Sequence, residues 1–422
     1  MIGATENATE ILCIGTELLL GNILNSNSSW LSEQIALLGL PHYRQSVIGD
    51  NEERLIETIN EASSRCRILI TTGGLGPTQD DITFSSLAKA FNAKLEENKK
   101  VWEEIKRKEF SKHKEISTTS RKQAFVPKGS EIIPNKHGTA PGIIFTPKDN
   151  FTVICLPGVP YEMREMWSTS VTRWLQKNLS LSTKLESTFL NFAGISEPKL
   201  AEIVADLMDQ ENPSVAPYAS LGDIKLRITA RSQTSGQSQQ LLLPIEKEIL
   251  SRTGSLCYGK GEETLASVAL QLLRVRDQTL SVAESCTGGK LGAALTEIKG
   301  ASENFVGGII AYSNQTKKDL LGVHHQLLEK HGAVSKEVAL SMAKGLKKKI
   351  KSDWAISITG IAGPDGGTQS KPIGTVFIAI IGPNCCQVSQ EKFGEHTGRK
   401  GIQTLSVVRS LDLFRLTLHS QS

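Results

Sequence analysis

A serine and a lysine, a pair that can perform hydrolysis, stand at the ends of two expected strands in the C-terminal part of the chain. Ser285 lies in the stretch 280–292 (LSVAESCTGGKLG), where an apolar run gives way to small polar residues and then to an expected helix. A helix start carries unpaired N–H groups and a partial positive charge, which would stabilise an oxyanion beside a hydroxyl. Cys286 is a second candidate nucleophile at the same turn.

Lys317 is the better candidate for the base, because the histidines of this part, at positions 324, 325, 331, 396 and 419, lie in helical or charged surroundings. It follows the segment 311–314 (AYSN), which ends the expected strand 305–311. A lysine acts as a base only in its neutral form, which requires partial desolvation or a neighbouring cation. Ser–Lys pairs are an established variant of the serine triad. Plainer interpretations stay open: a helix cap for Ser285, a packing role for Cys286 and a surface position for Lys317.

A glycine-rich loop, residues 359–368 (TGIAGPDGGT), follows a third expected strand, 354–359. If the three strands share one sheet, their ends converge, and the loop offers backbone N–H groups to an oxyanion or a phosphate. A simple turn is the alternative. The residues alone therefore predict a hydrolase or a phosphate-ligand site here.

A separate set of polar residues follows strands in the N-terminal part. The loop 71–81 (TTGGLGPTQDD) comes directly after the buried strand 67–72. Its N–H groups would hold a phosphate, and Asp80 and Asp81 would hold Mg²⁺ against a diphosphate. The alternative is that one of these aspartates only caps a helix that begins near Ile82. Residues 15–17 and 25–27 follow the first strand, and we expect them to face the same crevice.

Length and pattern together predict an α/β chain of three domains, with a small α+β domain in the middle. A chain of 422 residues is too long for one ordinary core. Strands that alternate with helices in the first part predict a doubly wound parallel sheet with ligands at the carboxyl ends of the strands. In the middle part, apolar and polar residues alternate as in strands with one solvent-exposed face, and we predict a small α+β domain. We place the domains at 1–175, 176–258 and 259–422.

Composition excludes several classes of protein. The net charge of +4 does not suggest a nucleic-acid or membrane partner. The basic run 344–351 is predicted to form the solvent-exposed face of a helix. The seven cysteines are odd in number and include no C-x-x-C pair, which favours a reducing compartment. The N-terminus lacks a secretory pattern and no apolar run would span a membrane, so we expect a cytoplasmic protein.

The C-terminal part resembles the nicotinamide-nucleotide amidase domain of the CinA family. The resemblance rests on AESCTGG at 283–289, AYSNQTK at 311–317, GAVS at 332–335 and TGIAGPDGGT at 359–368. It implies hydrolysis of nicotinamide mononucleotide (NMN) to nicotinate mononucleotide and ammonia, with Ser285 as the nucleophile and Lys317 as the base and no metal. The residues that it assigns to substrate binding are Thr287, Gly288, Tyr312, Ser313, Asn314, Thr359, Gly360, Gly363 and Arg399.

The N-terminal part resembles the molybdopterin-binding-like domain that the CinA family shares with molybdenum-cofactor enzymes. The resemblance rests on GTELLLG at 15–21, TGGLGPTQDD at 72–81, HGTAPG at 137–142 and LPGVPYEM at 156–163. It implies a pyrophosphatase that cleaves ADP-ribose to AMP and ribose 5-phosphate with a divalent metal, Mg²⁺ or similar, on Asp80 and Asp81. The nucleotide-binding residues would be Gly15, Thr16, Glu17, Asn25, Asn27, Gly73, Gly74, Gly76, Thr78, Gly138, Pro157 and Gly158.

One position departs from the family pattern, and it motivates alternatives. Asn25 stands where family members often carry an aspartate, and the lost carboxylate would weaken metal binding. The first alternative is therefore a non-catalytic N-terminal domain that binds a pterin or nucleotide as a competence-linked scaffold. The second is that both pockets are nucleotide sensors. The resemblance also implies a KH-like middle domain and a homodimer.

Overall fold

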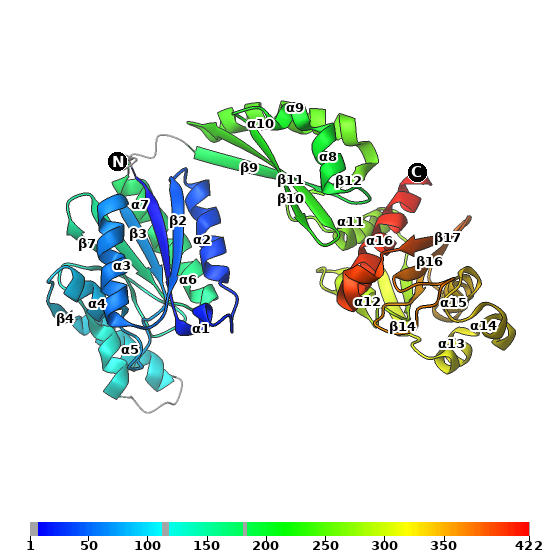
Figure 1. Cartoon of the computed structure of the whole chain (residues 1–422), viewed down its shortest axis with the longest axis horizontal. Helices are drawn as coiled ribbons and strands as arrows, with labels where there is room; N and C mark the ends of the chain where they lie inside the picture. Colours follow the sequence, from blue (N-terminus) through cyan, green and yellow to red (C-terminus); the bar gives the residue numbers. More distant parts are fainter. Residues whose placement is uncertain (1–6, 112–117, 180–183, 422) are drawn as a thin grey trace. The chain divides into compact units, whose positions relative to one another are not determined.

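The computed structural model describes residues 7–111, 118–179 and 184–421. Contacts divide the chain into two compact units, Met1–Glu186 with Arg231–Ser238, and Ser187–Ala230 with Gln239–Ser422 (Figure 1). Each unit is described by itself below. No helix in the described ranges is both long and apolar enough to cross a membrane.

The first unit is built on a six-stranded sheet of order β2-β1-β3-β8-β7-β6. The strands are β1 Thr9–Ile14, β2 His42–Ile48, β3 Ile68–Thr72, β6 Glu131–Ile133, β7 Gly142–Lys148 and β8 Phe151–Leu156. The first four in the order, β2, β1, β3 and β8, are parallel, but β7 pairs antiparallel with β8, and β6 pairs antiparallel with β7. The expectation of a purely parallel sheet is therefore wrong at one edge. Only two residues, Asp149 and Asn150, join β7 to β8, and a connection this short permits only antiparallel pairing.

Helices cover both faces of this sheet, as predicted for a doubly wound domain (Figure 1). On one face, Leu12 and Leu69 pack with Leu55 and Leu87; on the other, Ile70 packs with residues of α2 and α6. The helices are α1 Thr16–Leu19, α2 Ser26–Leu37, α3 Glu52–Arg65, α4 Thr83–Ala90, α5 Lys99–Ser111, η1 Thr118–Ala124, α6 Pro160–Met166, η2 Trp167–Val171 and α7 Thr172–Asn178. A two-stranded ribbon is formed by β4 Leu95–Glu97 and β5 Phe125–Pro127.

The middle segment forms a separate four-stranded sheet of order β10-β11-β9-β12, with its own core. Its elements are β9 Lys184–Phe192, α8 Glu197–Ile203, α9 Ala205–Met208, β10 Ser214–Ser220, β11 Asp223–Ser232, α10 Ser235–Thr253, η3 Gly254–Leu256 and β12 Cys257–Lys260. The predicted small α+β domain is confirmed.

The C-terminal sheet has the order β14-β13-β15-β16-β17, and its first three strands are parallel. The strands are β13 Leu280–Glu284, β14 Phe305–Ile310, β15 Trp354–Gly360, β16 Thr375–Gly382 and β17 Cys385–Lys392. The helices are α11 Leu265–Val275, α12 Lys290–Thr296, η4 Ala301–Glu303, α13 Asn314–Leu321, α14 His325–His331, α15 Lys336–Ile350, η5 Glu395–Thr397 and α16 Gly398–Ser420. The carboxyl ends of β13, β14 and β15 therefore meet at one edge, as expected.

Alternation along the strands divides the C-terminal core into two layers. Val282 and Ile356 face a cluster that includes Phe414 of α16, whereas Ala283 faces Met342 of α15. The basic run 344–351 falls on α15 and its C-cap, and the buried face of this helix is apolar, as predicted. This packing fixes the sheet edge on which the candidate site stands.

Candidate active site

The side chains of Lys317 and Ser285 are in hydrogen-bond contact. Lys317 Nζ donates to Ser285 Oγ at 3.0 Å, and to the carbonyl oxygens of Ala311 and Tyr312 at 2.8 and 3.1 Å. The Lys317 side chain is buried, with 1% of its surface exposed, although it is a lysine on a helix with polar neighbours. Burial lowers the pKa of this amine, and the neighbouring Cys286 opposes the effect. The geometry therefore places a desolvated amine beside a hydroxyl, as a Ser–Lys pair requires.

The helix α13 brings Lys317 to this position directly after β14. Ser313 is its N-cap, and the Ser313 hydroxyl accepts from the N–H of Thr316 at 3.0 Å. Through this cap Ser313 helps to position the lysine on the helix. Asn314 is the first residue of the helix and is exposed.

Cys286 is a poor nucleophile in this environment. Its thiol is buried, and burial raises its pKa to about 12, so very little thiolate exists near neutral pH. The Cys286 carbonyl accepts from Gln403 Nε2 of α16 at 2.8 Å, which fixes the turn from outside the motif. A Cβ at Gly360 would lie 3.1 Å from the Cys286 sulfur, so this glycine allows close packing against the thiol.

The sequence predicted that the N–H groups at a helix start would stabilise an oxyanion. This prediction is wrong for α12, because the Glu284 carboxylate already accepts from those N–H groups. The α12 helix begins at Lys290, and the buried Glu284 carboxylate accepts from the N–H groups of Gly289, Leu291 and Gly292 at 3.0, 3.1 and 2.8 Å. Those donors are not available to a substrate. The sequence did not predict this role of Glu284, because the residue types around it do not show in which direction the backbone turns after the strand.

Replacing Glu284 by glutamine is expected to loosen the start of α12. The amide keeps one acceptor oxygen but turns an NH₂ group toward an N–H donor, and hydrogen bonds to a charged group contribute about 1.5–3 kcal/mol each. We expect the amides of 289–292 to exchange with deuterium roughly tenfold faster or more, measured by hydrogen-exchange mass spectrometry. Glu297→Gln, an exposed carboxylate at the other end of α12, is the matched control. Equal protection in the two variants would contradict the capping role.

Other donors remain beside Ser285. Among the described residues, no oxygen accepts from the N–H groups of Cys286 and Thr287. The Thr287 hydroxyl is buried and has no partner in this part of the structure. Gly288 and Gly289 have φ angles of 62° and 102°, which only glycine adopts readily, so the turn depends on both. The turn 286–289 is therefore the best placed source of donors for an oxyanion.

Tyr312, Arg399 and Gly363 form a second polar group at this edge. Arg399 donates to the Tyr312 hydroxyl at 2.8 Å and to the Gly363 carbonyl at 2.7 Å. Because the Tyr312 carbonyl accepts from Lys317, this group is linked to the Ser–Lys pair. The Thr359 hydroxyl is buried and donates to the Ala333 carbonyl at 2.8 Å, so its hydrogen is already engaged.

Candidate nucleotide cavity

A cavity of about 850 Å³ lies at the carboxyl ends of the strands in the first unit. All the residues predicted for this site line it except Thr16. Thr16 instead bonds through its N–H and its hydroxyl to Asp50 Oδ2, both at 2.9 Å. Asp50, which was not predicted, lines the cavity, as does Glu162.

Two glycine loops offer backbone donors to this cavity. No acceptor in the described part of the chain pairs with the N–H groups of residues 74–76 or 158–159. Gly73 supports the first loop: its φ is 108°, and a Cβ there would lie 2.1 Å from the Ile14 carbonyl oxygen. Five N–H groups from two strand ends are a suitable cradle for phosphate oxygens.

The side-chain amides of Asn25 and Asn27 make different contacts. Asn25 is the N-cap of α2, and its Oδ1 accepts from the N–H of Ser28 at 3.1 Å. Asparagine and aspartate cap helices about equally well, so the departure at position 25 preserves this role. Asn27 Nδ2 donates to Thr72 Oγ1 and to the Gly158 carbonyl at 3.0 and 2.8 Å, and so ties two strand ends together.

Neither aspartate of the loop caps the following helix. The α4 helix begins at Thr83, and its N-cap Ile82 has no side-chain cap. Asp81 Oδ2 instead accepts from the N–H and the hydroxyl of Thr78 at 2.8 and 2.5 Å, which closes the loop on itself. Among the described residues, no group of three metal-ligating side chains occurs. Asp80 and Asp81 both line the cavity, and carboxylate oxygens are ligands of the kind that Mg²⁺ prefers.

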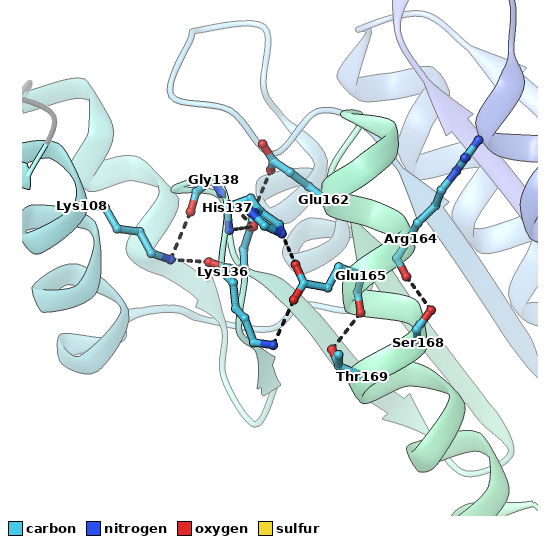
Figure 2. A network of polar contacts seen from close by, with 10 residues as sticks. Lys108, Lys136, His137, Gly138, Glu162, Arg164, Glu165, Ser168 and Thr169 are labelled. Atoms are coloured by element: carbon cyan, nitrogen blue, oxygen red, sulfur yellow. Dashed lines mark hydrogen bonds and ion pairs between the residues drawn. The ribbon is translucent and has the colours of Figure 1, made fainter. Parts of the chain in front are cut away.

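Figure 2 shows the polar contacts around residues 136–138, of which His137 and Gly138 line the cavity. Lys108 of α5 donates to the carbonyls of Asn135 and Gly138, and Glu162 of α6 accepts from the Asn135 amide at 2.7 Å. His137 pairs with Glu165. A Cβ at Gly138 would lie 2.3 Å from Glu162 Oε2, so the carboxylate packs directly on this glycine. Lys108 and Glu165 lie outside the motifs of the sequence, and only the fold brings them to this segment.

Comparisons with known proteins agree along the whole chain. Residues 10–177 match the probable molybdopterin binding domain, 187–259 the damage-inducible protein CinA KH domain, and 262–418 the CinA C-terminal domain. A CinA-like protein of Prochlorococcus marinus is 55% identical over 99% of this chain and 98% of its own length. The chain belongs to the CinA family. A CinA-like protein of Synechococcus sp. is 52% identical over 99% of this chain and all of its own length.

The chain is also similar to a solved structure, competence/damage inducible protein CihA from Agrobacterium tumefaciens. The two are 36% identical, and the match covers 37% of this chain and 93% of the CihA chain, with a TM-score of 0.36. The three family matches follow one another along the chain in the same order as the six-, four- and five-stranded sheets.

Proposed function

We propose that the C-terminal domain hydrolyses the carboxamide of NMN. The observation that carries the proposal is the 3.0 Å contact between Ser285 Oγ and the buried amine of Lys317. Neutral Lys317 takes the Ser285 proton while Oγ attacks the amide carbon. The lysine then gives that proton to the departing nitrogen, ammonia leaves, and water hydrolyses the acyl-enzyme to the carboxylate.

The surroundings of the pair support this reaction. The N–H groups of residues 286–287 and the Thr287 hydroxyl supply donors for the oxyanion and the amide. Arg399 supplies a positive charge for the NMN phosphate at the same edge. The test is to incubate the full-length protein with NMN and follow ammonia; unchanged NMN with tight binding would favour a sensor instead.

We propose for the N-terminal domain the cleavage of ADP-ribose to AMP and ribose 5-phosphate. The observation that carries this proposal is a cavity of about 850 Å³ with two carboxylates and two sets of backbone N–H groups that have no acceptor among the described residues. A divalent metal held by Asp80 and Asp81 would neutralise charge on the diphosphate. The loops of residues 74–76 and 158–159 would bind its oxygens. Both proposals together make the chain an enzyme of pyridine-nucleotide salvage.

Replacing Asp80 by asparagine is expected to reduce AMP formation from ADP-ribose roughly tenfold or more, with a higher metal requirement, because one of two protein carboxylates is lost. Asp80 is the better position to test, since Asp81 also holds Thr78. Asp149→Asn, in the β7–β8 turn outside the cavity, is the control. An unchanged metal dependence in Asp80→Asn would contradict the metal assignment. Bound ADP-ribose with no AMP from the wild type would favour the scaffold.

A further inference from the structure

The long C-terminal helix α16 contacts the candidate active site at two points that are one helical turn apart. Arg399 donates to the Tyr312 hydroxyl and the Gly363 carbonyl, and Gln403 Nε2 donates to the Cys286 carbonyl at 2.8 Å. Residues four apart lie on the same face of a helix, so one face of α16 is turned toward the site. The proposed function uses Arg399, but it uses no atom of Gln403.

Gln403 holds the one carbonyl in the middle of the nucleophile turn. The Ser285 carbonyl accepts from the N–H of Gly288 at 3.2 Å, so the turn itself satisfies this group. The Cys286 carbonyl has no such backbone partner, and within the described residues its donor is the Gln403 side chain. A substitution at position 403 therefore removes a hydrogen bond from the turn without changing a residue of the turn.

The bond to the Cys286 carbonyl also determines where the next N–H group points. The Cys286–Thr287 peptide is trans, so its C=O and N–H lie in one plane and point in opposite directions. Gln403 thereby fixes the direction of the Thr287 N–H, one of the two donors that the proposed mechanism uses for the oxyanion. A hydrogen bond to the carbonyl also polarises the peptide group, which strengthens its N–H as a donor.

The helix that carries Gln403 is held firmly in place. Ile402 and Phe414 of α16 belong to the buried core of the domain, and Arg409 pairs with Glu391 of β17 at 3.1 Å. A group is positioned most precisely when it stands on a packed regular element. Gln403 itself is half-buried, so its side chain reaches the turn from the edge of this core.

We propose that Gln403 is a positioning residue of the amidase reaction, which holds the Cys286–Thr287 peptide in the orientation that stabilises the oxyanion. The inference rests on the function proposed for the C-terminal domain, and it assigns Gln403 no contact with the substrate. Because negative charge develops on the oxygen only as the reaction proceeds, loss of Gln403 should lower kcat rather than raise KM. The pH at which kcat/KM rises should stay the same, since Gln403 makes no hydrogen bond to Lys317.

The test compares ammonia release from NMN by the full-length wild type, Gln403→Met and Gln403→Arg. Methionine is similar in length but has no donor, and we expect it to lower kcat about tenfold or more and to leave KM unchanged. Arginine keeps a donor for the carbonyl and should restore most of the wild-type kcat. Gln387→Met, which removes a hydrogen bond to Thr417 near the other end of α16, is the matched control and should leave kcat unchanged.

A second measurement does not depend on activity. The Cys286 thiol is buried in the same turn, so the rate of its alkylation by iodoacetamide reports whether the turn stays closed. Mass spectrometry of the digested protein separates this thiol from the other cysteines. We expect Cys286 to be alkylated faster in Gln403→Met than in the wild type, and at the wild-type rate in Gln403→Arg and Gln387→Met.

The proposal would be overturned if Gln403→Met kept the wild-type kcat, or if it raised KM alone. A lowered kcat that Gln403→Arg does not restore would also overturn it, because the donor would then not be the property that matters. If the wild type releases no ammonia, the proposed function fails and the oxyanion role of Gln403 fails with it. The alkylation rates then show separately whether Gln403 holds the turn.

Discussion

Ser285→Ala is expected to lower ammonia release from NMN by roughly three orders of magnitude or more, because the proposed acyl-enzyme cannot form without the hydroxyl. The measurement is the initial rate of ammonia formation by the full-length protein at saturating NMN. The substitution removes one of the three hydrogen bonds that Lys317 donates and leaves the two carbonyl partners in place. The fold of the turn should therefore survive, and lost activity would report on chemistry.

Cys286→Ala is the matched control for the nucleophile. The thiol lies next to Ser285 in the chain and is buried, and its raised pKa of about 12 makes it a weak competitor. We expect this variant to retain most of the wild-type rate. Retained ammonia release in Ser285→Ala, together with its loss in Cys286→Ala, would assign the chemistry to the thiol and overturn the Ser–Lys mechanism.

The placement of Ser285 and Lys317 at one sheet edge could be predicted from the sequence, because it follows from strand order. Two parallel strands that are neighbours in one sheet bring the residues that follow them to the same edge, whatever the intervening chain does. The burial of Lys317 was not visible in the same way. The residue stands next to Lys318 in a polar helix, and only the packing of α13 against α15 shows which of the two lysines is covered.

The residues that support the sites could not be predicted from the sequence, for a different reason. The role of Glu284 depends on the direction in which three N–H groups point after a turn of two glycines, and no residue pattern encodes that direction. The cavity wall that includes Glu109 and Gln123 comes from a charged helix and a short 3₁₀ helix whose composition is typical of a surface. Such residues reach a site through the fold, so a search for motifs does not find them.

Lys317 offers the second large effect, and two substitutions separate its possible roles. Lys317→Met keeps an apolar stem in the buried site and removes the amine, and it is expected to lower the rate of NMN deamidation roughly 10²–10⁴-fold, the usual contribution of a general base. Lys317→Arg keeps hydrogen-bond donors for the carbonyls of Ala311 and Tyr312 but is always protonated, so it cannot take the Ser285 proton. Both variants should lose activity to this extent if the lysine is the base, whereas an active Lys317→Arg would mean that the lysine only positions the turn.

The pH dependence of the wild type tests the same assignment without a mutation. The base form of Lys317 is the neutral amine, so kcat/KM for NMN should rise with pH and level off above the pKa of this amine. Burial lowers that pKa, and the rise should therefore be centred below the value of about 10.4 that is usual for lysine. A profile that is flat across this range, or one that falls as pH rises from neutral, would contradict a lysine base. Because the lowered pKa follows from the burial of Lys317, any variant that lets water reach the amine should move the rise toward higher pH.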